Sequence, residues 1–280
     1  MVLLLMLTAA LQVHEWGIIT SNELFTASPL STAGEQTEPV FEDKAPVLYF
    51  HGDPCTVNVR VSFPNMGWAT AALPEPSQGG INSTSLAWEN LKLGHINTIS
   101  SWPECDDTQF PVQLWREVQA LDIIMENESD RFLYYECAPG SPGDLPFICQ
   151  SGNTAIRMPY GEIPVIVLKS TLQGPMYGVF TISEIVNDIP RELQFLEDPE
   201  HLRREVRRWA DGILFEDEFD AFWKTWESSF LSDMGKQVMI LYPVPEEIIN
   251  SFAEIEVVPE RETEVELNRF VVAALPYKTL

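Results

Sequence analysis

Hydrophobic and polar residues alternate along much of the first two-thirds of the chain, as they do in half-buried β-strands. The clearest stretch is 56–63, in which one face carries Val57, Val59, Val61 and Phe63. Further strands are predicted at residues 13–20, 46–50, 85–93, 131–135, 163–168 and 176–183. Strands 46–50 and 56–63 flank a turn-like sequence at 51–55, so we expect them to form a hairpin.

Prolines and glycines separate these segments and predict loops between them. Residues 21–45 and 64–84 have the composition of surface loops, and the Pro/Gly-rich stretch 138–146 is expected to be exposed. Residues 110–125 fit either a helix or a strand, because some of their apolar positions have helical spacing and others do not.

The pattern changes near residue 197, where apolar residues recur at helical spacing. A helix is predicted over 198–212, with Asp198 as its N-cap and Pro199 as its first residue. A second helix is predicted over 216–231, with one face formed by Phe219, Phe222, Trp223, Trp226 and Phe230. A strand at 237–242, a short helix or turn at 245–251 and two terminal strands follow.

These elements predict an α+β protein that is predominantly β, with sandwich-like antiparallel sheets and a helical hairpin in the C-terminal third. Residues 1–12 are expected to be a signal peptide and 13–196 a β-rich body. Residues 197–280 then supply the helical hairpin and the terminal strands, packed on the same body.

The first ten residues are apolar apart from Thr8 and end in small residues. A membrane-spanning helix needs about 20 apolar residues, so this run is typical of a signal-peptide core, and we predict a protein exported to the periplasm or the medium. No Lys or Arg precedes the run, and the alternative is a buried first strand. No later stretch is long enough for a transmembrane segment.

Four cysteines are spread along the chain, and no two of them form a CxxC pair. Paired-cysteine zinc sites and thioredoxin-type centres are therefore not expected. In an exported protein, four such cysteines most simply form two disulfides. We favour Cys137–Cys149, which leaves Cys55–Cys105; the alternative is four buried thiols.

The formal net charge is −25, from 42 acidic and 17 basic residues. A field of this sign repels phosphate backbones, so nucleic-acid binding is not expected. The hydrophobic content of 45% is that of a folded chain, so the acidic residues belong to a folded surface.

The stretch Val13-His14-Glu15-Trp16-Gly17, with Thr20 just after it, resembles the start of a family of uncharacterised secreted bacterial proteins. Members of that family open with His-Glu-Trp-Gly-Thr-Phe-Thr directly after the signal peptide. Residues 45–50, Trp226 with Phe230, and 238–243 are similar too, although Ile18 and Ile19 replace the family's Thr-Phe. The resemblance implies export and implies no particular chemistry.

Motifs of the common nucleotide-binding, serine-hydrolase, HExxH and EF-hand sites are absent from the sequence. The scarce histidines are then the main candidates for chemistry. Successive side chains of a strand point to opposite faces, so His14 shares a face with Trp16 and not with Glu15. His51 and Asp53 lie at a strand-end turn, where they could bind a metal or pair as base and orienting carboxylate.

The candidate site is therefore a cluster of His14, His51 and His95 with Asp53 or Glu15. The three histidines are the candidate ligands of a divalent metal, and His14, Glu15, His51 and Asp53 are the catalytic candidates. The alternatives are a core histidine at 14 with a salt-bridged glutamate at 15, and a plain Asp-Pro turn at 53–54.

Two groups of residues are candidates for binding. Four arginines lie opposite the apolar face of the first helix, where they could bind an anion or pair with the acidic run 216–220: Arg203, Arg204, Arg207 and Arg208. Three tryptophans in irregular regions are free to face a ligand: Trp68, Trp88 and Trp102.

Two functions fit these observations. The first is an exported, non-enzymatic protein that binds a protein or polymer partner through loops on a β scaffold. The alternative is a metal-assisted hydrolase built on the histidine and carboxylate cluster.

Overall fold

A computed structural model of the chain describes residues 10–21, 41–96, 111–125, 128–138, 147–150, 153–156, 163–181, 193–231 and 237–278. Strands dominate this part and form a nine-stranded sheet, a five-stranded sheet and a two-stranded ribbon, with few helices. The predicted class, α+β and mostly β with sandwich-like sheets, is confirmed. None of the described helices is long and apolar enough to cross a membrane.

The nine-stranded sheet draws on both ends of the described chain. Its spatial order is β13 (Gln194–Phe195), β12 (Gly174–Thr181), β11 (Pro164–Thr171), β14 (Gln237–Pro243), β16 (Val265–Lys278), β1 (Leu11–Ser21), β2 (Phe41–His51), β8 (Leu133–Ala138) and β4 (Trp68–Leu73). Neighbouring strands are antiparallel except β1 and β16, which run parallel with Leu11 paired to Val265. The C-terminal strands therefore lie in the middle of the sheet.

The five-stranded sheet has the order β15 (Glu254–Pro259), β3 (Cys55–Ser62), β5 (Ser85–Gly94), β6 (Asp122–Met125) and β7 (Glu128–Asp130). The separate ribbon pairs β9 (Phe147–Gln150) with β10 (Asn153–Ile156). Phe63, directly after β3, packs on Tyr135 of β8, which joins the five-stranded sheet to one face of the large sheet.

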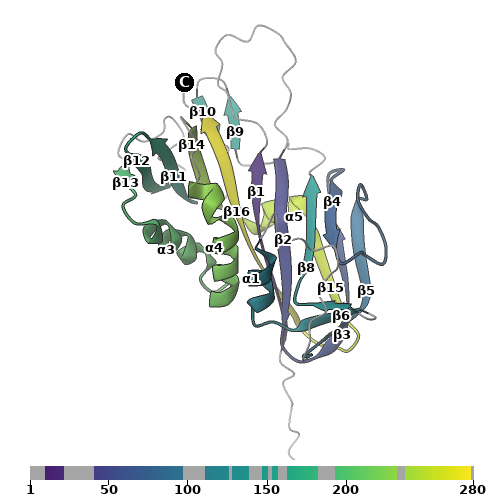
Figure 1. Ribbon diagram of the computed structural model, residues 1–280. Coiled ribbons are helices and arrows are strands. Elements are labelled where there is room, and N and C mark those ends of the chain that lie inside the picture. Colours follow the sequence, from purple (N-terminus) through teal and green to yellow (C-terminus); the bar gives the residue numbers. More distant parts are fainter. Residues whose placement is uncertain are drawn as a thin grey trace, which may run out of the picture.

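The other face of the large sheet carries helices α3 (Pro199–Ala210) and α4 (Glu216–Leu231), which lie in front of β11, β14 and β16 in Figure 1. The short helix α1 (Val112–Glu117) lies on the same face, because the Trp16 ring of β1 contacts both Trp115 of α1 and Phe222 of α4. Helix α5 (Glu246–Phe252) lies on the opposite face, where Asn250 bonds to Arg269. The large sheet thus has its apolar core on both faces.

Both long helices begin and end close to where the sequence predicted. The Asp198 carboxylate accepts a hydrogen bond from the Glu200 N–H and caps α3. Gly212, just past the end of α3, has φ +79°, a conformation that glycine adopts without steric strain. In α4 the five predicted aromatic residues are buried against the sheet.

Two predictions about the N-terminal half are wrong. Strands β2 and β3 do not form a hairpin; they belong to different sheets, because the chain crosses from one sheet to the other at 52–54. Gly52 allows this crossing with φ +129°, and a Cβ there would lie 3.1 Å from the Ala10 carbonyl oxygen. Residues 64–84, predicted as a loop, contain the strand β4.

The predicted signal peptide is described only at its end. Residues 1–9 lie outside the described residues, as do most of the predicted loop 21–45 and the loop after β8. Leu11 is buried in β1, and its N–H donates to the Glu264 carbonyl oxygen. The first strand therefore begins two residues before the expected start of the mature chain.

Candidate functional site

Two of the predicted histidines lie side by side on the helix-covered face of the large sheet. His14 of β1 pairs with Tyr49 of β2, so His51, two residues further along β2, lies diagonally across from His14 on the same face. Their ring centroids are 4.8 Å apart. Both side chains are buried, with 2% of His14 and 9% of His51 exposed.

A glutamate from α4 joins the two rings. The Nδ1 of His14 lies 2.7 Å from Oε2 of Glu218, and the Nε2 of His51 lies 3.0 Å from Oε1. The Glu218 side chain is fully buried. One carboxylate therefore bridges two imidazoles, each of which contacts a different oxygen.

Glu218 also holds the start of its own helix. The N–H of Phe215, just before α4, donates to Oε2 of Glu218 at 2.7 Å. A glutamate in the third helical position that bonds back to the residue before the helix is one half of a capping box. Because Phe222 follows four residues later on the buried side of α4, the same position points Glu218 at the sheet.

The environment of Glu218 favours the carboxylate form. Burial by itself raises the pKa of Glu218, but hydrogen bonds and charge interactions with His14 and His51 lower it, and the net pKa lies below the ordinary value. An ionised carboxylate only accepts hydrogen bonds. It can accept one from each ring nitrogen of His14 and His51 that faces it and carries a hydrogen.

These three residues also have the composition and spacing of a metal site. One ligand atom from each of His14, His51 and Glu218 lies within 4.8 Å of the others. Tetrahedral zinc with bonds of about 2.0–2.1 Å needs ligand atoms about 3.3 Å apart, so the widest of the three separations would close by up to about 1.5 Å on binding. Two histidines and one glutamate are a zinc-binding set that leaves a fourth position for water or another ligand.

The rest of the predicted cluster does not join them. His95 and Asp53 are exposed, and neither belongs to the group of close ligand atoms. Glu15 points to the opposite face of β1, as the alternation of the strand requires. The predicted set of His14, His51 and His95 with Asp53 or Glu15 is therefore corrected to His14, His51 and Glu218.

Glu15 has a structural environment of its own. Its two carboxylate oxygens accept hydrogen bonds from the Tyr135 hydroxyl and from Nε of Arg269, and the side chain is fully buried. The Arg269 guanidinium also donates to Asn250 and to the Ala253 carbonyl oxygen, each at 2.7 Å. This ion pair joins α5 to β1 and β16. The described contacts of Glu15 are with protein groups, which fits a structural role.

The arginine face of α3 pairs within the helical hairpin. Arg203 forms an ion pair with Asp220, and Arg207 lies 3.0 Å from Glu216. Both guanidinium groups also lie over the Phe219 ring. Arg208 pairs with Glu205 on its own helix, while Arg204 is exposed. The pairing of these arginines with the acidic run 216–220, which the sequence offered beside an anion site, is present for Arg203 and Arg207.

The three candidate tryptophans have different environments. Trp68, at the start of β4, is 38% exposed, whereas Trp88 is buried and donates its ring N–H to the Pro74 carbonyl oxygen. Trp102 lies outside the described residues. Only Trp68 of the two described residues has the exposure that stacking on a ligand requires.

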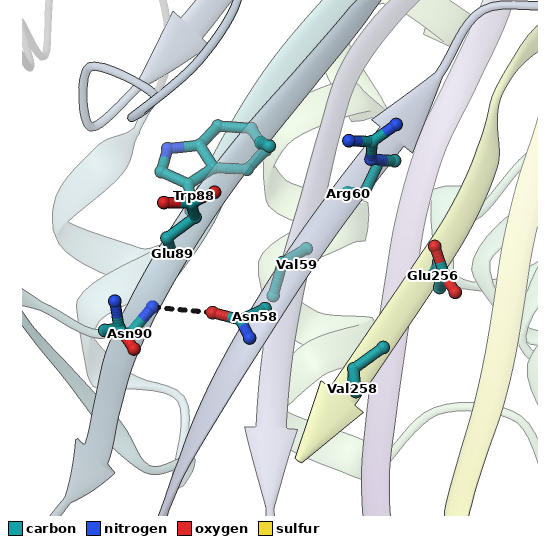
Figure 2. Close-up of a pocket in the computed structure, with 9 residues that line it drawn as sticks. Asn58, Val59, Arg60, Trp88, Glu89, Asn90, Glu256 and Val258 are labelled. Atoms are coloured by element: carbon teal, nitrogen blue, oxygen red, sulfur yellow. Dashed lines mark hydrogen bonds between the residues drawn. The ribbon is translucent and has the colours of Figure 1, made fainter. Parts of the chain in front are cut away.

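A shallow depression of about 360 Å³ lies on the outer face of the five-stranded sheet, away from the histidines (Figure 2). Its described lining is Asn58, Val59, Arg60, Ala87, Trp88, Glu89, Asn90, Glu256 and Val258. The Asn58 side chain accepts a hydrogen bond from the Asn90 N–H at 2.8 Å. Because Trp88 is fully buried beneath it, the depression offers no aromatic face to a ligand.

No disulfide is present among the described residues. Cys137 is buried, and its sulfur lies 3.9 Å from the Phe252 carbonyl oxygen; Cys55 is half-buried. Cys105 and the side chain of Cys149 lie outside the described residues. The pairings Cys137–Cys149 and Cys55–Cys105 each include one of these two and stay predictions.

Comparisons with known proteins add little. No family model matches the chain, and no curated protein sequence matches it. One solved structure that is similar is the Fcho1 Mu homology domain of Danio rerio with bound Eps15 peptide. It is 10% identical, the match covers 96% of this chain and 95% of that chain, and the TM-score is 0.32, which is too low to support a conclusion.

Sequence reasoning found two of the three clustered residues and missed Glu218. A signal for it was present, because Glu218 lies four residues before Phe222 on the apolar side of a predicted helix. An acidic residue at such a position is buried only if it has a partner. That partner could not be identified without knowing which face of the sheet the helix covers.

Proposed function

We propose that this protein binds one divalent transition-metal ion, for which zinc is the best fit, through Nδ1 of His14, Nε2 of His51 and the Glu218 carboxylate. The observation that carries the proposal is the convergence of three buried ligand groups from β1, β2 and α4. Metal binding needs a lone pair on each of these two ring nitrogens, so any hydrogen on them moves to the other nitrogen of the same ring or to solvent. Imidazole and carboxylate ligands suit zinc, copper and nickel more than calcium or magnesium.

A metal-assisted hydrolase is the second candidate. Three protein ligands leave one coordination position for a water molecule, which a bound zinc ion would activate as a nucleophile. This candidate is favoured by the position of the cluster directly behind Phe215, a residue that is 45% exposed, so that the metal lies close to solvent.

Partner binding is supported by a different observation. Three large hydrophobic side chains are exposed around the start of β4: Met66, Trp68 and Ile81, at 78%, 38% and 67%. The segments that carry them are joined by hydrogen bonds between the backbones of Ala69 and residues 82–83. Such a patch is typical of a surface that contacts a partner, and an exported protein would present it outside the cytoplasm.

The metal proposal is tested by titrating the chelator-treated protein with zinc and measuring bound metal by elemental analysis. We expect one zinc ion per chain in the native protein. The substitutions His51→Ala and Glu218→Gln each remove a ligand, and the affinity should fall about 100-fold or more.

The matched control is His95→Ala, which changes an exposed histidine outside the cluster and should leave zinc binding unchanged. Circular dichroism shows whether each variant is folded. A native protein that is folded but takes up no zinc, copper or nickel would rule the proposal out. Equal affinities of the native and His51→Ala proteins would place the metal elsewhere.

A further inference from the structure

The three candidate ligands lie between the sheet and α4, and among the described side chains the partly exposed Phe215 ring lies against both imidazoles. His14 and His51 project from β1 and β2, and Glu218 projects towards them from α4. The Phe215 ring completes the arrangement, with its centroid 4.8 Å from each imidazole centroid. Phe215 is 45% exposed, whereas Glu218 is fully buried and His14 is 2% exposed.

Hydrogen bonds hold the backbone of Phe215, while its ring is partly exposed. Its N–H donates to Glu218, and its carbonyl oxygen accepts a hydrogen bond from the Phe219 N–H at 3.0 Å. The inner side of the ring packs on the two imidazoles, and about half of the side chain faces water. A partly exposed side chain changes rotamer quickly, so this ring can rotate away without disturbing the backbone that holds α4.

We propose that Phe215 is the gate of the metal centre: the ion, and any fourth ligand, enters and leaves past this ring. The inference rests on the proposed metal site, and it assigns to Phe215 control over the rate at which the metal ion enters and leaves that site. In the closed position the ring covers the outer side of both imidazoles and keeps competing ligands from the ion. The three ligands set the affinity, whereas the ring sets the rate at which the ion is exchanged.

The gate is tested by loading the full chain with Co²⁺ or Zn²⁺ and adding a large excess of EDTA. The rate of metal loss is followed by the absorbance of Co²⁺, or by a colorimetric zinc indicator. Because Phe215→Ala keeps both backbone hydrogen bonds but removes the ring, metal loss should become at least 10-fold faster. The equilibrium affinity should change less than about 3-fold, and Phe215→Leu should give an intermediate rate.

Phe195→Ala is the matched control, since Phe195 is 46% exposed like Phe215 but lies on β13, at the edge of the large sheet. Its rate of metal loss should equal that of the native protein. Equal rates in the native and Phe215→Ala proteins would overturn the gate while leaving the metal site standing. If Phe215→Leu both binds the metal more weakly and loses it faster, Phe215 is a structural part of the site. This result would also overturn the gate. A native protein that holds no metal overturns both proposals.

Discussion

At the scale of single residues, the buried phenol of Tyr242 should make the fold less stable at alkaline pH. Burial raises the pKa of Tyr242 well above its ordinary value of about 10. A raised pKa in the folded state means that stability is complete below the unfolded pKa and is lost as the pH rises above it. The free energy of unfolding should therefore fall above pH 10.

The substitution Tyr242→Phe tests this directly. It should remove about 1.4 kcal/mol of the loss between pH 9 and pH 11, because the unfolded state of the variant no longer releases that proton. The measurement is urea unfolding at several pH values. Tyr177→Phe, at a half-buried position, is the control. If the two variants have the same pH dependence, the buried phenol is not the cause.

The candidate site also shows which of its residues could be predicted from the sequence. His14 and His51 were recognisable because histidines are scarce, and because His14 lies in a predicted strand and His51 at the turn that ends another. Their closeness depends on the register that pairs His14 with Tyr49, which alternation alone does not determine. Glu218 is 204 residues from His14 along the chain, and only the packing of α4 on the sheet brings them together.

At the scale of elements, the two faces of β1 have different roles: one carries a candidate metal ligand and the other a buried ion pair. His14 faces α4 and the candidate metal ligand Glu218, and Glu15 faces α5 and the buried Arg269. Neighbouring residues of this strand should therefore give variants with different defects.

We expect Glu15→Gln to lower the free energy of unfolding by about 3 kcal/mol, because it leaves the Arg269 charge buried without its carboxylate. Its zinc affinity should match that of the native protein. His14→Gln should lose zinc affinity. Urea unfolding of the metal-free proteins and zinc titration measure the two properties. A large loss of zinc affinity in Glu15→Gln would show that the two faces are coupled.

The positions of helices and strands were predicted more reliably than the pairing of the strands. The helices α3 and α4 have strong periodicity and clear start signals, and strand β3 has almost perfect alternation, so their positions follow from local sequence. The predicted hairpin of β2 and β3 failed because the glycine at 52 suits both a tight turn and a crossing between sheets. Which of the two occurs depends on pairing with β1, which is not a local property.

At the scale of the whole molecule, the net charge of −25 should make stability depend on salt. The folded state brings the acidic residues closer together than the unfolded chain does, and ions screen their repulsion. Raising NaCl from 10 mM to 500 mM should increase the free energy of unfolding by about 1 kcal/mol or more, equivalent to about 2–4 °C in Tm.

Thermal unfolding of the metal-free protein measures this effect, and choline chloride at the same ionic strength is the control for a specific action of sodium. Both salts should give the same rise. A Tm that falls with salt would show that the ion pairs of α3 and α4, such as Arg207 with Glu216, outweigh the general repulsion.

The parallel pairing of β1 with β16 sets an order for folding during synthesis. Glu15 and its partner Arg269 are 254 residues apart, so at 5–20 residues per second β1 waits roughly 13–50 seconds on the ribosome for its neighbour. During that time β1 has an open edge in what becomes the centre of the largest sheet. A chain truncated before residue 265 keeps that edge open and should be prone to aggregate through it.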